Sequence, residues 1–386
     1  TSGDFIWAKS LGSEGAEFAL SVTIDVEGNV ITVGQFYHTV DFDPGTGTVN
    51  LISNGASDIF IQKLDANGNF IWAKSIGSST GDDPQSVSTD SLGNIFISGG
   101  VGGFNEAVDF DPGPGVFNII VIGYYDVFTQ KLDTNGDFLW AKSIGSTGVD
   151  SGYDHAAGGH TDQLGNIYTT GVYSGTADFD PGPETLIYTS NGELDFFIQK
   201  LDGNGNLIWA KSMGASAMDR AHSITNDALG NVYIVGSFMN TVDFDPGPDI
   251  FNLSSNGGWD IYILKIDANG DFSWAMSMGS TWNDVAYSIT TDTLGNIYTT
   301  GYFEGALEEL IDFDPGAGTF NLISNQTRDV FIQKLSQNDS TVVEAVNELV
   351  IPTAITPNND QINDIWNLEN IDVLYPENIV RIFNRW

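Results

Sequence analysis

The chain has 386 residues, of which 41% are hydrophobic and 12% aromatic, and it contains 45 glycines and no cysteine. Its 51 acidic and 13 basic side chains give a net charge of −38, which argues against nucleic acids and anionic membranes as partners, because both require a basic face. No run approaches 18 apolar residues, so no membrane-spanning helix is expected. Because the chain has no cysteine, disulfides and thiolate metal sites are excluded.

The sequence contains an internal repeat. Segments like FIWAKSLGS recur every 65 to 69 residues, centred on Trp7, Trp72, Trp140, Trp209 and Trp274. A D-x-x-G-N turn begins at Asp25, Asp90, Asp162, Asp227 and Asp292. An aspartate precedes an apolar strand (DIFIQKL in the first copy) at Asp58, Asp126, Asp195, Asp260 and Asp329. Such self-similarity indicates a repeat architecture, and we number the copies repeats 1 to 5.

Each repeat predicts four strands, which we call A to D. In repeat 1 these are 18–25, 29–36, 58–65 and 69–76, and two Asp/Gly/Asn-rich turns join A to B and C to D. The segments are rich in Val, Ile, Phe, Tyr and Thr, as strands are. Four antiparallel strands per repeat predict a propeller blade.

The two ends of the repeat array are complementary. Repeat 5 has strands A, B and C at 285–292, 296–303 and 329–335 but lacks strand D, whereas the chain starts with a spare D-type strand at 3–11. Pairing of these ends would remove the exposed strand edges. We therefore predict an all-β fold, a five-bladed propeller over residues 1–335 closed by the N-terminal strand. The alternative is an open piece of a longer array.

The string DFDPG occurs once per repeat, and its first aspartate lies 17 residues before the strand C aspartate in all five copies. This fixed length predicts an ordered strand or hairpin. The two aspartates lie on one face of an extended segment, about 6–7 Å apart, and repel by roughly 2–3 kcal/mol. Calcium would offset that repulsion. The candidate calcium ligands are Asp41, Asp43, Asp109, Asp111, Asp178, Asp180, Asp243, Asp245, Asp312 and Asp314.

Turn chemistry is the alternative role for these aspartates, because a carboxylate before Pro-Gly also accepts backbone N–H groups. The strand C aspartates, such as Asp58, either complete the cation's ligands or cap a turn, and we favour the cap.

A second acidic set lies eight residues before the D-x-x-G-N turn and comprises Glu17, Asp82, Asp154, Asp219 and Asp284. If strand A lines the propeller axis, these residues form a ring at one mouth of the channel, where they would bind a cation or another ligand. The alternative is a loop carboxylate that bonds the next blade's backbone.

Lysine and histidine placement argues against catalysis. All nine lysines occupy two repeat positions, on strands C and D, which indicates packing of their stems or pairing with local aspartates. Of the four histidines, His155, His160 and His222 fall on strand A and could approach the axis, although we expect structural roles. No G-x-S-x-G, H-E-x-x-H or P-loop motif is present, and we expect no enzyme.

Residues 279–301 read GSTWNDVAYSITTDTLGNIYTTG, and this pattern resembles the bacterial β-propeller repeat called SBBP. The resemblance covers residues 1–335 and implies the blade fold. The chain departs from that family in its five repeats, where seven are implied, and in the DFDPG insertion.

Residues 350–386 include VIPTAITPNNDQINDIWNLENI and YPENIVRIFNRW, and they resemble the first half of the sorting domain of gliding-motility-associated surface proteins. The resemblance implies export by the type IX secretion machinery of Bacteroidota and retention at the cell surface. Residues 336–349, polar and acidic, are interpreted as a linker.

Three functions are compatible with these observations. The first is a secreted, calcium-stabilised cell-surface scaffold or adhesion protein without catalysis, with divalent cations, a surface glycan or a protein as partners. The second is a lectin-like propeller with one glycan pocket per repeat, to which Tyr37, Phe104, Tyr173, Phe238 and Phe303 could contribute. The third is a five-bladed glycosidase or lyase with axial carboxylates. Repeated acids argue against one asymmetric catalytic site. We rank the scaffold first, because the resemblance to a cell-surface sorting domain is the only one that bears on function.

Overall fold

The computed structural model of the chain describes residues 3–147, 154–325 and 327–336. The chain divides into two compact parts, Thr1–Leu335 and Ser336–Trp386, and the fold below is that of the first part. The predicted linker and sorting domain lie outside the described residues, except for Ser336. Secondary structure in the described residues is β throughout, as predicted, and no described helix is long and apolar enough to cross a membrane.

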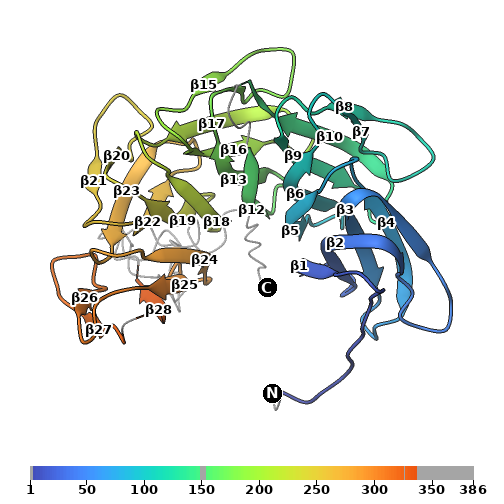
Figure 1. Cartoon of the computed structure of the whole chain (residues 1–386), viewed down its shortest axis with the longest axis horizontal. Helices are drawn as coiled ribbons and strands as arrows, with labels where there is room; N and C mark the ends of the chain where they lie inside the picture. The colour runs from blue at the N-terminus through green and yellow to red at the C-terminus, as the bar shows by residue number, and fades with distance from the viewer. Residues whose placement is uncertain (1–2, 148–153, 326, 337–386) are drawn as a thin grey trace, which may run out of the picture. The chain divides into compact units, whose positions relative to one another are not determined.

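The predicted A and B strands are present in every repeat (Figure 1). The A strands are β1 (Phe18–Ile24), β5 (Asp83–Thr89), β12 (His155–Thr161), β18 (Arg220–Asn226) and β24 (Val285–Thr291). The B strands are β2 (Val30–Asp41), β6 (Ile95–Gly102), β13 (Ile167–Tyr173), β19 (Val232–Phe238) and β25 (Ile297–Phe303).

The C strands are β3 (Asn50–Leu64), β9 (Tyr125–Leu132), β16 (Asp195–Leu201), β22 (Asp260–Ile266) and β28 (Asp329–Leu335). The D strands are β4 (Phe70–Ile76), β10 (Phe138–Ile144), β17 (Leu207–Met213) and β23 (Phe272–Met278). Hydrogen bonding follows the order A-B-C-D within each repeat, which gives four four-stranded antiparallel sheets and one three-stranded sheet, β24-β25-β28.

Local side-chain chemistry explains the short hairpin turns. In the first A–B turn, Asp25 Oδ1 accepts the backbone N–H groups of Glu27 and Asn29, both at 2.9 Å. Gly28 has a φ of 82°, a left-handed conformation that side chains other than Gly rarely adopt. The C–D turn uses the same device, with Asp65 Oδ1 accepting from Asn67 and Asn69. These turns set the strand register in each repeat.

The DFDPG insertion is ordered, as predicted. In repeat 1 it continues β2 and β3, and in the others it forms short hairpins. These are β7 (Ala107–Asp109) with β8 (Asn118–Ile120), β14 (Thr176–Asp178) with β15 (Ile187–Thr189), β20 (Thr241–Asp243) with β21 (Asn252–Ser254), and β26 (Leu310–Asp312) with β27 (Asn321–Ile323). A two-residue strand, β11 (Ser146–Thr147), joins the second of these hairpins.

The hydrophobic core lies between successive sheets. The B and C strands β13, β16, β19 and β22 are buried along their whole length, so both of their faces are covered. One cluster joins Tyr168 and Trp209 of repeat 3 to Val232 and Tyr262 of repeat 4. The A strands contact one another in the order β1, β5, β12, β18, β24, and they form the inner edge of the arc in Figure 1.

The predicted ring closure is not present in the structure. Residues 3–11 form no strand, and β28 is an edge strand in its three-stranded sheet. In Figure 1 the ends of the arc, at β1 and at β24–β28, do not meet. Val330 and Ile332 on β28 are therefore 76% and 82% exposed, whereas the equivalent Ile261 and Ile263 of repeat 4 are fully buried.

Candidate functional site

The DFDPG aspartates bind the backbone of their own turn. Asp41 Oδ1 accepts the N–H groups of Asp43 at 3.0 Å and Val49 at 2.8 Å, and Asp43 Oδ1 accepts that of Gly45 at 2.7 Å. The same three contacts recur in repeats 2 to 5. The backbone donors hold the pKa of Asp41 below its usual range. Each pair therefore shapes its turn, which was the alternative role.

These turn contacts account for the fixed length of the insertion without a cation. Among the described residues, no three or more His, Cys, Asp or Glu side chains are grouped so that they could hold a metal ion. Calcium favours six to eight oxygen ligands, so two carboxylates would need several backbone or water oxygens beside them. Calcium binding by DFDPG remains a prediction.

The strand C aspartates cap the loop that precedes them, as expected. Asp58 accepts the N–H of Asn54, and Asp126, Asp195, Asp260 and Asp329 accept the amide four residues upstream in the same way. In repeats 1 to 4 these carboxylates are at most 1% exposed. A glycine follows strand D beside each of them, and its added Cβ would lie within 2.5 Å of the carboxyl group. They are buried structural groups.

The second acidic set does not form an open ring. Asp82, Asp154, Asp219 and Asp284 are fully buried, not exposed at a channel mouth. Asp82 Oδ2 accepts the N–H of Ser78 at 2.6 Å, and its Oδ1 accepts that of Gly102 at 2.9 Å. The same two contacts recur in repeats 3 to 5. Each carboxylate thus connects the loop before strand A to the end of strand B through hydrogen bonds. These backbone N–H donors satisfy the carboxylate oxygens and so permit its burial.

Glu17 is the member of this set that differs. It is only half-buried, and it accepts hydrogen bonds from the backbone and hydroxyl of Ser13 at 3.2 and 2.7 Å. The longer side chain of Glu17 binds its own loop and makes no contact of the kind that Asp82 makes with strand B.

The two buried acidic sets meet between neighbouring repeats. Burial raises the pKa of Asp82 to about 7, and the nearby charge of Asp58 acts in the same direction. The other pairs are Asp126 with Asp154, Asp195 with Asp219, and Asp260 with Asp284. The Oδ1 atoms of Asp195 and Asp260 are buried and have no hydrogen-bond partner among the described residues. These pairs favour binding a proton when the chain folds.

The strand C lysines link neighbouring repeats. Lys63 Nζ lies 2.9 Å from Asp25 Oδ2 in its own A–B turn and donates to the carbonyl oxygen of Thr134 in the next repeat at 2.9 Å. Lys131 pairs with Asp90 and donates to Gly203 in the same way. Four of the five also lie over a strand B aromatic ring, at 4.8 to 5.4 Å. The predicted pairing with local aspartates is confirmed for Lys63 and Lys131.

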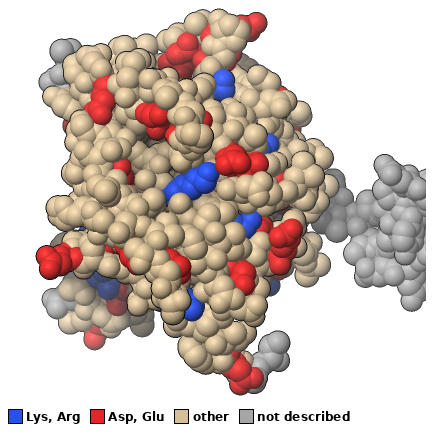
Figure 2. Space-filling model, turned by 90° about the vertical axis from the view of Figure 1, so that its right-hand side faces the viewer, with Lys and Arg blue, Asp and Glu red and all other residues tan. Residues whose placement is uncertain are grey.

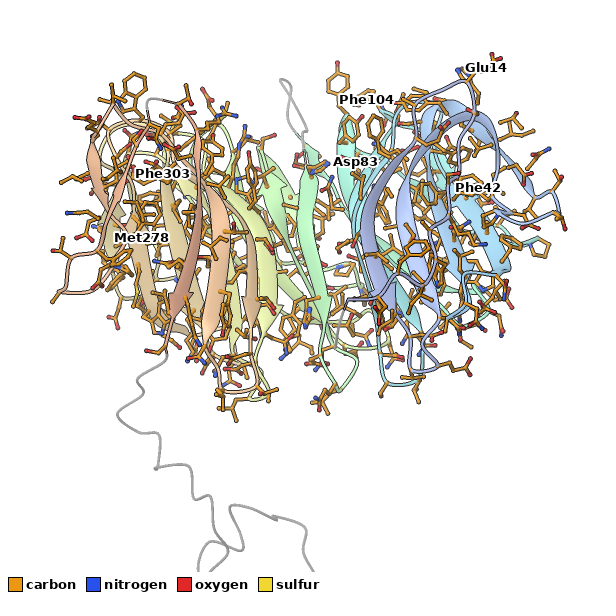
Figure 3. The ribbon with its side chains drawn as sticks, turned by 90° about the horizontal axis from the view of Figure 1, so that it is seen from below. Glu14, Phe42, Asp83, Phe104, Met278 and Phe303 are labelled. Carbon is orange, nitrogen blue, oxygen red and sulfur yellow. The ribbon has the colours of Figure 1, made fainter. Side chains whose placement is uncertain are left out.

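The aromatic residues proposed for a repeated glycan pocket are mostly in the core. Tyr173, Phe238 and Phe303 are at most 3% exposed, so the prediction of exposed rings is wrong for them. Their rings pack edge-on against the phenylalanine of DFDPG, as in the Phe303–Phe313 contact at 5.2 Å. Phe104 is 65% exposed, and Figure 3 shows it at the end of the strands, whereas Phe303 lies among them.

The strand A histidines lie apart in separate contacts. His155 Nε2 is 3.0 Å from Asp83 Oδ2, which Figure 3 places at the same end of the strands as Phe104. His222 contacts Ser237 Oγ at 3.3 Å and the ring of Tyr287 at 5.4 Å between centroids. Burial lowers the pKa of His160 and of His222, the latter to about 4. No described group of three ligands includes a histidine, so a metal site there gains no support.

Comparison with known proteins identifies two segments. Residues 278–302 match the SBBP β-propeller repeat family, and residues 349–386 match the CHU_C type IX secretion signal domain family.

Two curated proteins are similar to part of the chain. An uncharacterized WD repeat-containing protein of Acanthamoeba polyphaga mimivirus is 27% identical over 231 residues, 53% of this chain. The regulatory protein FlaEY of Caulobacter vibrioides is 25% identical over 211 residues, 48% of this chain. The matched stretches cover only 16% and 22% of those proteins.

A solved structure, that of a protein of unknown function from Bacteroides caccae, aligns with a TM-score of 0.33 and 11% identity. The alignment covers 72% of this chain and 70% of that chain. The chain thus carries an SBBP-type β-propeller repeat within an array of antiparallel sheets, and a type IX secretion signal domain at residues 349–386.

Proposed function

We propose that this protein is a non-catalytic scaffold at the cell surface, built on a five-bladed propeller. The secretion signal domain points to export, and the propeller repeat supports a rigid body to be exported. The observation that carries the proposal is that the repeated charged groups make structural contacts within and between repeats. The buried aspartates accept backbone amides, and the strand C lysines join one repeat to the next.

This use of charge favours a scaffold over a glycosidase or lyase. A hydrolytic pair needs one protonated and one ionised carboxyl in different environments. Here the equivalent aspartates of repeats 2 to 5 have the same backbone partners, so no one of them is set apart as an acid or a base.

The export part of the proposal can be tested on intact cells. In a bacterium with a type IX secretion machinery, the full chain should be digested by added protease without cell lysis. A variant lacking residues 349–386 should stay protected, because it lacks the signal domain. Equal protection of both proteins would overturn the surface role, and a lysed sample checks that both are cleavable.

We further propose that residues 3–11 supply strand D of repeat 5. Trp7 Nε1 donates to the carbonyl oxygen of Ala66 at 3.0 Å, as strand D residue Trp209 donates to Ala268 in the following repeat at 3.2 Å. Residues 3–11 thus already contact repeat 1 as a preceding strand D would. Pairing with β28 would also cover the exposed Val330 and Ile332.

Engineered cysteines test this closure, since the chain has no cysteine. In repeat 1, Ile61 pairs with Lys74, and the equivalent partners in the closed ring are Ile332 and Lys9. The variant with Lys9→Cys and Ile332→Cys should form a disulfide within the monomer, because paired Cα atoms lie within reach of one.

The matched control combines Lys9→Cys with Val330→Cys, on the same strand face but two residues out of register, and should stay reduced. Non-reducing electrophoresis and mass spectrometry distinguish the outcomes. A disulfide found only in dimers would contradict closure and indicate head-to-tail association, and no disulfide in either form would reject the pairing.

Calcium is a secondary part of the proposal, supported by the net charge of −38 and the five DFDPG pairs. A thermal melt in millimolar calcium and in EDTA tests it. An unchanged melting temperature would reject calcium binding, and the DFDPG carboxylates would then serve only to shape their turns.

A further inference from the structure

The residues that depart from the repeat gather where repeats 4 and 5 meet. Five of the nine tryptophans are the repeated strand D residues, and the only other two within the propeller are Trp259 and Trp282. The propeller has two arginines, Arg220 and Arg328. All four lie at the strand ends where strand A begins and strand B finishes. A repeat array gives no structural reason for this concentration.

The contacts of these residues join them into one surface. Arg220 lies over the Trp259 ring at 5.1 Å, and the backbone N–H of Trp259 donates to Asn283 Oδ1 at 3.2 Å, next to Trp282. Strands β18 and β24 are neighbours and bring His222 against Tyr287. We call the surface formed by Arg220, His222, Trp259, Trp282 and Tyr287 the arginine–tryptophan corner.

Arg220 is a cation without an anionic partner among the described residues. Its Nη2 contacts Met218 Sδ at 3.5 Å, and its Nε is buried with no hydrogen-bond partner in the described part of the chain. Trp259 Nε1 is likewise buried and unpartnered there. By contrast, Arg328 pairs with Glu304 at 2.8 Å. A buried guanidinium nitrogen with no partner among the described residues calls for an explanation, and a ligand that accepts its N–H would supply one.

We propose that the arginine–tryptophan corner binds a carboxylated sugar, such as a uronic acid unit of a glycan. A guanidinium stacked on an aromatic ring still presents N–H donors at its edge, and their geometry matches a carboxylate. The apolar face of a sugar ring packs on exposed aromatic rings, and Trp282 and Tyr287 are each 54% exposed. These rings favour a sugar over an acidic peptide.

Local charge is compatible with an anionic ligand despite the net charge of the chain. Salt screens charges beyond about 8 Å at physiological ionic strength, so the groups nearest the corner decide. Asp219 directly precedes Arg220, Asp260 directly follows Trp259, and Asp284 lies two residues after Trp282; burial raises the pKa of each. Glu304 is close to Tyr302, which contacts Tyr287, and is paired with Arg328. His222 has a pKa of about 4, so Arg220 supplies the positive charge at neutral pH. This proposed binding site does not depend on the proposed export of the protein.

Calorimetric titration with trigalacturonate and with its methyl ester tests the proposal. The wild-type protein should bind the acid and bind the ester at least about tenfold more weakly, because the ester lacks the charge that Arg220 would pair with. Arg220→Gln should weaken binding of the acid by a similar factor. The control Lys74→Gln removes an outer-strand cation that pairs with exposed Asp137 and should leave binding unchanged.

Trp282→Ala is the second variant, because it changes an exposed side chain and should weaken both forms even if Arg220→Gln fails to fold. Three results would overturn the proposal: no binding of the acid, equal binding of acid and ester, or full binding by both variants. Binding of a glutamate-ended tripeptide without binding of the sugar would also reject it, in favour of a protein partner.

Discussion

Replacing Lys63 with alanine should lower the free energy of unfolding by about 3–5 kcal/mol, the effect typical of breaking a buried ion pair. The Lys63 and Asp25 side chains are only 4% and 1% exposed, and their charged atoms are 2.9 Å apart. The substitution leaves the Asp25 carboxylate buried without its counter-charge and removes the bond to Thr134 in the next repeat. Denaturant unfolding followed by circular dichroism measures the loss.

The loss should shrink as the pH falls. Burial acts to raise the pKa of Asp25, and hydrogen bonds from Lys63 and Asn29 outweigh it and keep that pKa below its usual range. Without Lys63 the burial effect is less opposed, so Asp25 should take up a proton at a higher pH. The matched control is Lys74→Ala, whose partner Asp137 is 71% exposed, and its cost should not exceed about 1 kcal/mol. Equal losses in the two variants would contradict the inter-repeat role of Lys63.

Lowering the pH from 8 to 5 should stabilise the propeller. Burial raises the folded-state pKa to about 7 for Asp82, Asp154 and Asp260, and to about 6 for Asp58 and Asp219. In the unfolded chain these groups titrate near 3.9, so the folded state binds more protons between about pH 4 and 7. Stability then falls as the pH rises, by about 1.4 kcal/mol per pH unit for each extra proton bound. Thermal and urea melts across this range measure the slope.

Asp260→Asn separates this effect from the general relief of charge repulsion. The neutral amide removes the repulsion from Asp284 and needs no proton, so the variant should be more stable than wild type at pH 8 and show a smaller pH slope. The control Asp65→Asn removes one charge from an exposed turn, where backbone and side-chain contacts with Asn69 lower the pKa. An Asp260→Asn slope equal to that of the wild type would contradict raised proton affinity at the buried pair.

The local elements of the fold could be read from the sequence. The Asp, Gly and Asn residues of the hairpin turns act within five residues, so Asp25 and Gly28 predict their turn without knowledge of the rest of the chain. The same holds for the DFDPG hairpin, whose fixed spacing reflects the bond from Val49 to Asp41. The cap role of the strand C aspartates is also local, since donor and acceptor are four residues apart.

The candidate sites depended on contacts between repeats, which periodicity does not reveal. The sequence pattern of a repeated carboxylate is the same whether the side chain is exposed or buried. Only the packing of the sheets shows that Asp82 is buried close to Asp58. Figure 2 shows acidic side chains at the surface of one side of the molecule, whereas Asp82 is fully buried. The exposure of Phe303 at the end of strand B was misjudged for a different reason, because Phe313 from the DFDPG insertion of the same repeat covers it.

The sequence by itself determined the repeat, the strands, the hairpin turns and the ordered insertion, because each depends on residues close together in the chain. The tertiary structure decided which charges are buried, which lysines join neighbouring repeats, and that Arg220 lies over the ring of Trp259. Those facts depend on residues far apart in the chain, as in the bond from Lys131 to Gly203, which are 72 positions apart. Solvent exclusion between sheets gives such contacts their energy, and it exists only once the sheets pack.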